Sequence, residues 1–312
     1  MKTSAARTLT AITCASLLIG NSFAEKSAPN SNNISQVFQE AVGFLDGWRG
    51  NPENLEQARY RLDSILAANP NDARAHREYA RYYIMRQGPR WAENTEQSLQ
   101  KAISIQPNFA EAYVLKGHFY HIIGNDSIAE EALKKAENIG TIDPWLHINW
   151  AEILLAKKMY SAAATRFKKV IDSNTPNKKA MLSAYEGLIA YHIYINELDN
   201  AELLHRRLIK IEPESAWLKG NYGAFLLCTK NNPAPAMARF RDALNQMNYQ
   251  FARIGLAAAI YRFRVDNPYK GNKPENDELI REAKSLADGS PYEVVKYFCE
   301  RGLAVNSMPQ KK

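Results

Sequence analysis

The segment IAEEALKKA, residues 128–136, contains the pattern from which the fold can be predicted. Its apolar residues Ala129, Leu133 and Ala136 are spaced by four and then three positions, which places them on one face of a helix. Small residues at both ends of that face let a neighbouring helix approach closely, while the large residue fills the space beside it. The segment is therefore predicted to be one helix of a closely packed pair.

The same spacing occurs six times along the chain. The six copies begin at Ala58, Thr95, Ala129, Ala163, Ala201 and Ala236. These residues lie 37, 34, 34, 38 and 35 positions apart, so a period near 34 residues organises most of the sequence. Small residues also stand twelve positions before two of the copies, at Gly117 and Ala151, as expected for the partner helix. Prolines, which cannot continue a helix, follow three copies at Pro70, Pro107 and Pro213.

The series Tyr113, Gly117, Tyr120, Ala129, Leu133 and Ala136 resembles the tetratricopeptide repeat. The resemblance covers about residues 54–250 and implies two antiparallel helices per repeat, stacked into a right-handed superhelix with a concave groove. Two departures stand out: His205 replaces a large apolar residue, and the sixth unit needs one extra residue, which we place within 231–235. The predicted fold class is all-α, an α-α solenoid of six to seven hairpins with a C-terminal capping helix.

Helical periodicity extends the array at both ends. The apolar pattern from Ile34 to Leu45 predicts the first helix of unit one. Residues 249–265 and 275–288 are predicted to form a seventh hairpin, and residues 291–304 a terminal helix that covers its apolar side.

The first 24 residues have the layout of a secretory signal peptide. A basic start, Lys2 and Arg7, precedes an apolar run from Leu9 to Ile19, and small residues precede a cleavage position after Ala24. A membrane anchor or a buried helix is the less favoured alternative, because the run is shorter than the ~20 residues that span a bilayer. We expect an exported, periplasmic protein without a transmembrane segment after cleavage. The chain then divides into a signal peptide at 1–24, a flexible lead-in at 25–33, the helical array at 34–304 and a disordered tail at 305–312.

The composition is that of a folded protein. Of the 312 residues, 46% are hydrophobic and 23% are charged, which excludes a collagenous or wholly disordered chain. The formal net charge of +7 is compatible with many kinds of partner. Two cysteines, Cys228 and Cys299, remain after signal cleavage. Because the predicted stack separates them by four helical steps of about 8–10 Å, we expect two buried thiols, with a disulfide as the alternative.

No catalytic motif is found in the sequence. It contains no Gly-rich phosphate loop, no Gly-x-Ser-x-Gly and no His-Glu-x-x-His, so we expect neither an enzyme nor a cofactor. The strongest candidates for chemistry are His118 and His121, which can hold a metal ion if Glu152 approaches them. Because a zinc site needs three or four ligands, we favour the alternative that both histidines line the groove or make hydrogen bonds.

In the family that the repeats resemble, the first helix of each hairpin lines the groove. Carried over by position, the resemblance implies a peptide-binding groove lined by Arg77, Ile84, Glu111, Val114, His118, His121, Trp145, Ile148, Glu152, Leu155, Trp217, Ala224 and Leu227. This mixture of aromatic, aliphatic and charged side chains suits a peptide or helix laid along the surface. The alternative for Trp145 and Trp217 is packing between hairpins. Units one and five are too irregular to be phased.

A narrower resemblance concerns one repeat. The segment NYGAFL at 221–226, with Ala236, Phe240 and Ala243, is similar to a repeat of type IV pilus biogenesis proteins, which are exported and assist assembly of the outer-membrane secretin. We therefore expect a non-enzymatic scaffold that binds a protein or peptide within an envelope assembly such as pilus or secretion machinery. Export and interspersed acidic residues argue against a nucleic acid partner. The alternatives are a metal-binding or enzymatic protein centred on His118 and His121, and a dimerisation module.

Overall fold

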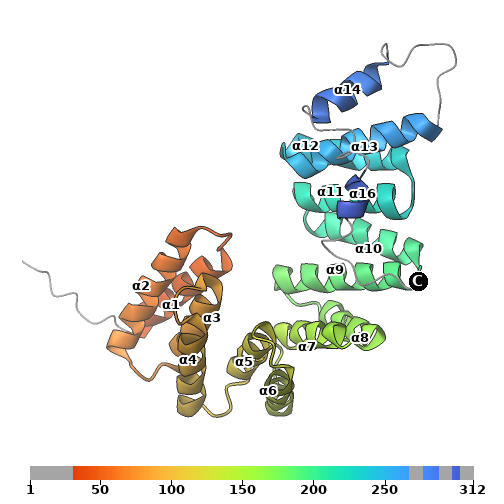
Figure 1. Cartoon of the computed structure of the whole chain (residues 1–312). Helices are drawn as coiled ribbons and strands as arrows, with labels where there is room; N and C mark the ends of the chain where they lie inside the picture. The colour runs from red at the N-terminus through yellow and green to blue at the C-terminus, as the bar shows by residue number, and fades with distance from the viewer. Residues whose placement is uncertain (1–30, 267–276, 288–296, 303–312) are drawn as a thin grey trace, which may run out of the picture. The chain divides into compact units, whose positions relative to one another are not determined.

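The computed structural model describes residues 31–266, 277–287 and 297–302. Every regular element among these residues is a helix, as predicted, and neighbouring helices pack in pairs (Figure 1). The predicted signal peptide and the tail at 305–312 lie outside the described residues. None of the described helices combines the length and the apolar character needed to cross a membrane.

The chain divides into two compact units, one ending at Asp72 and one beginning at Ala73. The first unit is a hairpin of α1 (Ser31–Asp46) and α2 (Pro52–Ala68), the pairing predicted for unit one. α1 begins three residues before the predicted start of the array. Asn51 caps α2 by accepting a hydrogen bond from the backbone N–H of Glu53 at 3.0 Å.

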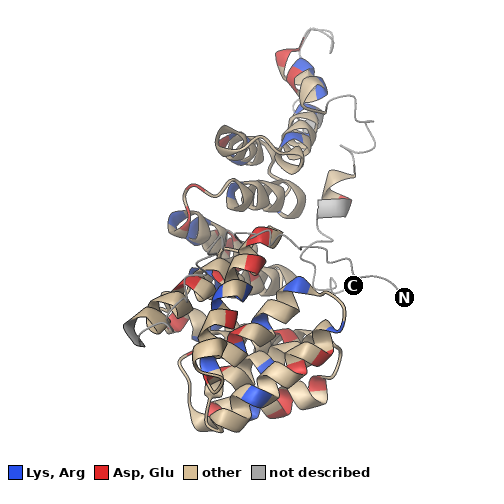
Figure 2. Cartoon of the chain, turned by 90° about the vertical axis from the view of Figure 1, so that its left-hand side faces the viewer, with Lys and Arg blue, Asp and Glu red and all other residues tan. Residues whose placement is uncertain are grey.

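The second unit is an array of six further hairpins. Its helices are α3 (Ala73–Arg86), α4 (Trp91–Ile105), α5 (Ala110–Ile122), α6 (Asp126–Ile139), α7 (Trp145–Ala156), α8 (Tyr160–Asp172), α9 (Lys178–Tyr194), α10 (Leu198–Ile211), α11 (Ala216–Ala224), the π-helical turn η1 (Phe225–Thr229), α12 (Pro233–Gln246), α13 (Gln250–Asp266), α14 (Glu278–Ala287) and α16 (Phe298–Gly302). We call α3/α4 to α13/α14 hairpins two to seven, and the odd-numbered member of each pair its first helix. Acidic and basic residues are interspersed along the helices of both units (Figure 2).

The repeated residues form the core, as the spacing predicts. The small residues that begin the six copies are all completely buried, and the larger residues that follow them are buried as well. A methyl group on Gly117 would lie 2.4 Å from Cδ2 of Leu133, so α5 and α6 approach too closely for any side chain there. His205 takes its place in the core by stacking on Tyr222, with ring centroids 5.3 Å apart.

A residue in the left-handed conformation marks the turn inside each of hairpins two to six. These residues are Arg90, Gly124, Lys158, Asn196 and Asn231. Each stands five positions before the small residue that begins the repeat in the second helix. The left-handed residue therefore gives a common reference position in these hairpins. Positions near the end of each first helix can be compared by counting back from it, whatever the length of the helix.

That reference position corrects the placement of the extra residue in hairpin six. The interval from Asn231 to Ala236 is five, as elsewhere, so no residue is inserted within 231–235. The interval from Gly223 to Asn231 is eight, whereas the corresponding interval from Gly117 to Gly124 is seven. The π-helical turn η1 lies in this stretch, and such a turn accommodates one additional residue within a helix.

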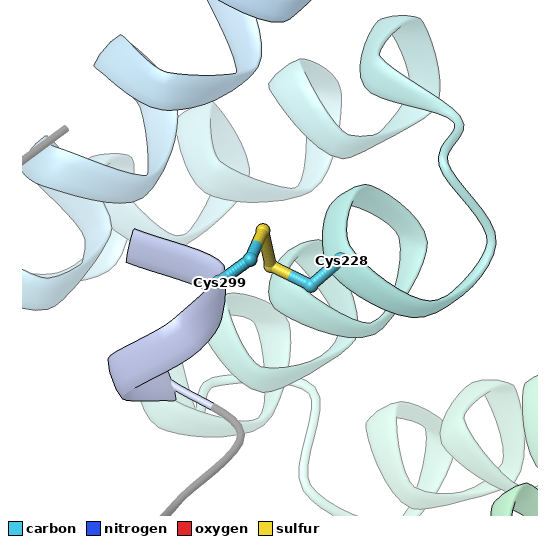
Figure 3. Close-up of a disulfide and its surroundings, with 2 residues drawn as sticks. All are labelled: Cys228 and Cys299. Carbon is cyan, nitrogen blue, oxygen red and sulfur yellow. A yellow bond between two sulfur atoms is a disulfide. The ribbon is translucent and has the colours of Figure 1, made fainter. Parts of the chain in front are cut away.

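The end of the described chain folds back onto hairpins six and seven. Cys228 and Cys299 form a disulfide with their Cα atoms 5.1 Å apart, so the expectation of two separate thiols is wrong (Figure 3). That expectation assumed that each successive helix lies farther along the stack. Instead, α16 lies beside η1 and α13, and the ring of Phe298 packs against those of both Phe240 and Phe251. α16 is the described part of the terminal helix predicted at 291–304.

Candidate partner-binding surface

The first helices of hairpins two to four place polar side chains next to one another. Glu78 in α3 is only 1% exposed and accepts hydrogen bonds from Arg77 and, at 3.3 Å, from Arg81. Burial lowers the pKa of Arg77, but attraction to Glu78 and Asp143 outweighs it and raises the pKa overall. The charge of Arg77 is therefore fixed, and its side chain is held by a buried carboxylate.

The loop between α6 and α7 adds acidic and hydroxyl groups to this surface. Thr141 donates a hydrogen bond of 3.0 Å to Glu111 of α5, and the backbone N–H of Asp143 donates to the Thr141 hydroxyl at 3.1 Å. Asp143 then accepts from the N–H of Trp145 at 3.0 Å and so caps the start of α7. Burial raises the pKa of Asp143. The sequence analysis predicted Glu111 and Trp145 but missed Thr141 and Asp143, for which the capping pattern before a helix was the available signal.

His118 and Glu152 face each other across α5 and α7 without a hydrogen bond. Nδ1 of His118 lies 3.9 Å from Oε2 of Glu152, beyond hydrogen-bonding distance, and has no hydrogen-bond partner within the described part of the chain. Burial, with a smaller effect of His121, lowers the pKa of His118 to about 4. Burial also raises the pKa of Glu152. Both side chains thus keep hydrogen-bonding capacity at a surface that is partly removed from water.

His121 does not join His118. Its Nδ1 lies 2.7 Å from Oδ1 of Asp126, at the start of α6. Among the described residues, no group of three or more His, Cys, Asp or Glu side chains is arranged to hold a metal ion. The geometry therefore gives no support to the metal-binding alternative centred on this pair.

Three residues predicted to line the groove are buried in the core. Val114 is 2%, Ile148 1% and Leu227 5% exposed, so their side chains offer almost no surface to a partner. Val114 and Ile148 are covered because adjacent first helices pack directly on each other. Asn149 of α7, for example, donates a hydrogen bond of 3.1 Å to the carbonyl of Val114.

The burial of Leu227 has a different cause, the extra residue in η1. In hairpins three and four, the predicted groove residues His121 and Leu155 stand three positions before the left-handed residue of the turn. In hairpin six that position belongs to Cys228, because one additional residue turns the helix by about 100° relative to a count from the helix start. At this position of hairpin six, the sequence analysis therefore predicted Leu227 and missed Cys228.

The remaining predicted residues are accessible to different extents. Trp145 is partly buried and packs against two successive core clusters, while Leu155 packs against the second of these. Ile84 and Ala224 are half-buried. Trp217 is 46% exposed and lies 5.7 Å from Phe251 between ring centroids. The accessible part of the predicted set thus lies mainly on α3, α5 and α7, with Trp217 and Ala224 separate on α11.

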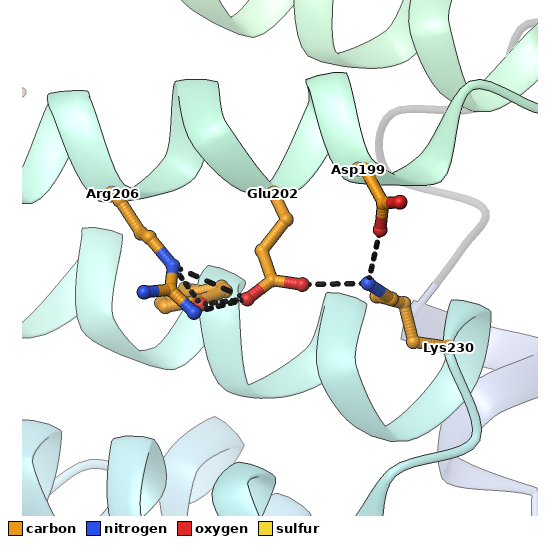
Figure 4. A network of polar contacts seen from close by, with 5 residues as sticks. Asp199, Glu202, Arg206 and Lys230 are labelled. Atoms are coloured by element: carbon orange, nitrogen blue, oxygen red, sulfur yellow. Dashed lines mark hydrogen bonds and ion pairs between the residues drawn. The ribbon is translucent and has the colours of Figure 1, made fainter.

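A polar network joins hairpins five and six (Figure 4). Glu202 of α10 accepts hydrogen bonds from Lys230 at 2.7 Å, from Arg206 at 2.6 Å and from the Tyr222 hydroxyl at 2.8 Å. Lys230 also contacts Asp199 at 2.8 Å. Hydrogen bonds from Lys230 and Arg206 lower the pKa of Glu202 to about 2. The network fixes the end of η1 to α10, so its role is structural.

Comparison with known proteins gives matches at the level of structure. No protein-family model matches the sequence, and no curated protein matches it either. The APC/C complex Cut9–Hcn1 is similar with a TM-score of 0.56 and 15% identity, over 73% of this chain and 46% of that chain. This chain therefore spans about half the length of that protein.

Two further structures are matched over almost their whole length. PilW, a widely conserved type IV pilus biogenesis factor, gives a TM-score of 0.50 and 15% identity, over 81% of this chain and 98% of its own. PilF of Pseudomonas aeruginosa gives 0.51 and 15%, over 70% of this chain and 99% of its own. With the repeat positions confirmed in the core, these likenesses show that the chain has the fold of a tetratricopeptide-repeat solenoid.

Proposed function

We propose that this protein is a non-enzymatic scaffold that is exported and binds a segment of a partner protein along the first helices of hairpins two to four. The observation that carries the proposal is the row of accessible polar and aromatic side chains on successive first helices. It includes Arg77, Glu111, His118, Trp145 and Glu152. A repeat array offers such a row at regular spacing, which suits an elongated ligand.

The chemistry of the row is suited to a peptide backbone and its side chains. Trp145 supplies an apolar anchor for a ligand. Its side chain is already held by packing against two core clusters, so little side-chain entropy is lost on binding. His118 and Glu152 lack a hydrogen bond to each other, and a ligand placed between them supplies the missing partner.

A place in an envelope assembly is supported by two independent features. The first is the signal-peptide pattern at residues 1–24. The second is the structural likeness to PilW and PilF, of which PilW is described as a pilus biogenesis factor. Both features together favour pilus or secretion machinery as the context of the partner.

Site-specific photo-crosslinking in the native envelope tests the binding surface. A photoreactive residue in place of Glu152 on α7 should capture a defined partner. The same residue in place of Glu131, exposed on the second helix α6, is the matched control and should not. Mass spectrometry identifies the product, and Trp145→Ala in the Glu152 variant should reduce its yield while the helical circular dichroism is retained. Equal capture from both positions would contradict the proposal.

Export is tested separately on the full chain. Cell fractionation should recover the protein from the periplasm, and sequencing of its N-terminus should begin at Glu25. Protein that retains Met1 and remains in the cytoplasm would show that the first 24 residues are not a signal peptide.

A further inference from the structure

Near its C-terminal end, the first-helix surface of hairpin six is covered by the chain itself. Cys228 occupies the position three before the left-handed residue Asn231, where hairpins three and four place His121 and Leu155. The disulfide to Cys299 therefore fixes α16 on the surface that carries the predicted partner-binding residues in the earlier hairpins (Figure 3).

A second contact holds the same segment. Phe298 is only 6% exposed, and its ring lies 5.8 Å from that of Phe240 and 5.2 Å from that of Phe251. A methyl group on Gly255 would lie 2.9 Å from Cζ of Phe298, so the absence of a side chain there makes room for the ring. These residues of α12 and α13 form a pocket for one aromatic side chain, which we call the Phe298 pocket.

The two contacts have different physical origins. The disulfide holds Cys299 covalently, whichever residues stand next to it in the sequence. The Phe298 pocket, in contrast, selects a side chain by its shape and apolar character. The extra residue in η1 is what brings Cys228 into reach, since without it the helix would present a different side chain at this position.

We propose that residues Tyr297–Gly302 are a built-in occupant of the surface at η1 and α13 in hairpins six and seven, recognised through the Phe298 pocket and held by the Cys228–Cys299 disulfide. The occupant excludes a partner from this surface, which includes Ala224, and confines partner binding to the earlier hairpins. The recognition of the segment by the Phe298 pocket is independent of the proposed function. The confinement of the partner to the earlier hairpins depends on the proposed function.

A disulfide-trapping experiment tests the recognition. The full chain carries Cys14→Ser, Phe298→Ala and Cys299→Ser, which leaves Cys228 as its single thiol and removes the anchor of its own segment. The probe is the synthetic peptide YFCERG, residues 297–302, with its cysteine activated as a mixed disulfide with thionitrobenzoate. The Cys228 thiolate attacks the peptide sulfur, and the thionitrobenzoate released is measured by its absorbance.

The expected result is that this peptide reacts at least about tenfold faster than YACERG, in which the phenylalanine is replaced by alanine. Adding Phe251→Ala to the protein should remove most of the difference, because it opens one wall of the pocket. Equal rates for the two peptides would overturn the proposal, since the segment would then be held by the disulfide alone.

A crosslinking experiment tests the confinement and separates it from the proposed function. In the disulfide-bonded protein, a photoreactive residue in place of Glu152 should capture the partner and one in place of Ala224 on α11 should not. In the Cys228→Ser, Phe298→Ala, Cys299→Ser protein, capture from position 224 should appear. Capture from position 224 in the disulfide-bonded protein would overturn the confinement of the partner. No capture from position 152 in either protein would overturn the proposed function instead.

Discussion

Hairpins three and four share their helix packing with hairpins six and seven but differ in what their first helices present. In the former, His118, Glu111 and Glu152 leave a polar surface that is partly open. In the latter, α16 is bonded to η1 and packs on α13, and Phe298 contacts the rings of Phe240 and Phe251. The difference shows that the repeat pattern specifies how helices pack on each other, whereas residues outside the pattern decide whether the surface is open or occupied.

The largest expected difference between the two regions concerns Phe240. Its fully buried ring contacts both Gly223 and Gly255, as well as Phe298, so Phe240→Ala should lower the free energy of unfolding by about 3–5 kcal/mol. Hydrogen exchange should show the loss of protection in α11 to α14, with α5 to α8 retained. An equal loss in α5 to α8 would mean that the two regions unfold as one cooperative unit.

Removal of the disulfide should have the next largest effect. The two cysteines are 71 residues apart in sequence, and a crosslink over a loop of this length stabilises by about 4 kcal/mol in the chain-entropy model. The Cys228→Ser, Cys299→Ser protein should lose about 2–4 kcal/mol, measured by denaturant unfolding of the second unit. Reduction of the wild-type protein should reproduce the effect, and a change seen mainly in hairpins three and four would contradict it.

The pH dependence of stability tests the burial of His205 in hairpin five. Burial lowers the pKa of His205 to about 3, whereas an unfolded chain takes up the proton near 6.5. Stability should therefore be complete above pH 6.5 and fall by about 1.4 kcal/mol per unit as the pH decreases toward 3. His205→Leu should remove this part of the slope in chemical unfolding at pH 7, 5 and 4. Parallel curves for both proteins would show that His205 is not buried as neutral imidazole.

The smallest expected effect is that of Glu202. Lys230 and Arg206 lower its pKa to about 2, so its ion pairs stabilise the fold above the pKa of an unfolded Glu and are lost as the pH falls toward 2. Glu202→Gln should cost about 1 kcal/mol at pH 7, measured by the denaturant midpoint. The difference from the wild-type protein should shrink between pH 4.5 and 2, and a constant difference would assign the cost to packing instead.

Sequence reasoning predicted the helices and their pairing because the spaced residues Ala129, Leu133 and Ala136 record a local geometry that every hairpin repeats. It was less successful for the surface. Val114 and Ile148 follow the same period as their accessible neighbours, and only the packing between successive first helices determines that they are covered. Thr141 and Asp143 lie in a loop, where periodicity carries no information.

The position of α16 beside η1 and α13 could not be predicted from the repeat pattern, for a physical reason. A repeat pattern describes contacts between neighbours in the array, and the disulfide joins residues that are not neighbours in that sense. The extra residue of hairpin six was detected from the number of residues in the repeat. Only the left-handed conformation of Asn231 shows that this residue lies before the turn and not after it.

The constant interval of five residues after the turn in hairpins two to six implies that the two helices of a hairpin do not tolerate length changes equally. A residue inserted before the turn can be absorbed as a π-helical bulge, as in η1, and it alters which side chain the first helix shows while the second helix keeps its place. A residue inserted after the turn would instead shift the small residues of the second helix out of contact with their partner. Insertions that the fold tolerates therefore change which side chains the first helix exposes, while the packing of the second helix on the first is kept.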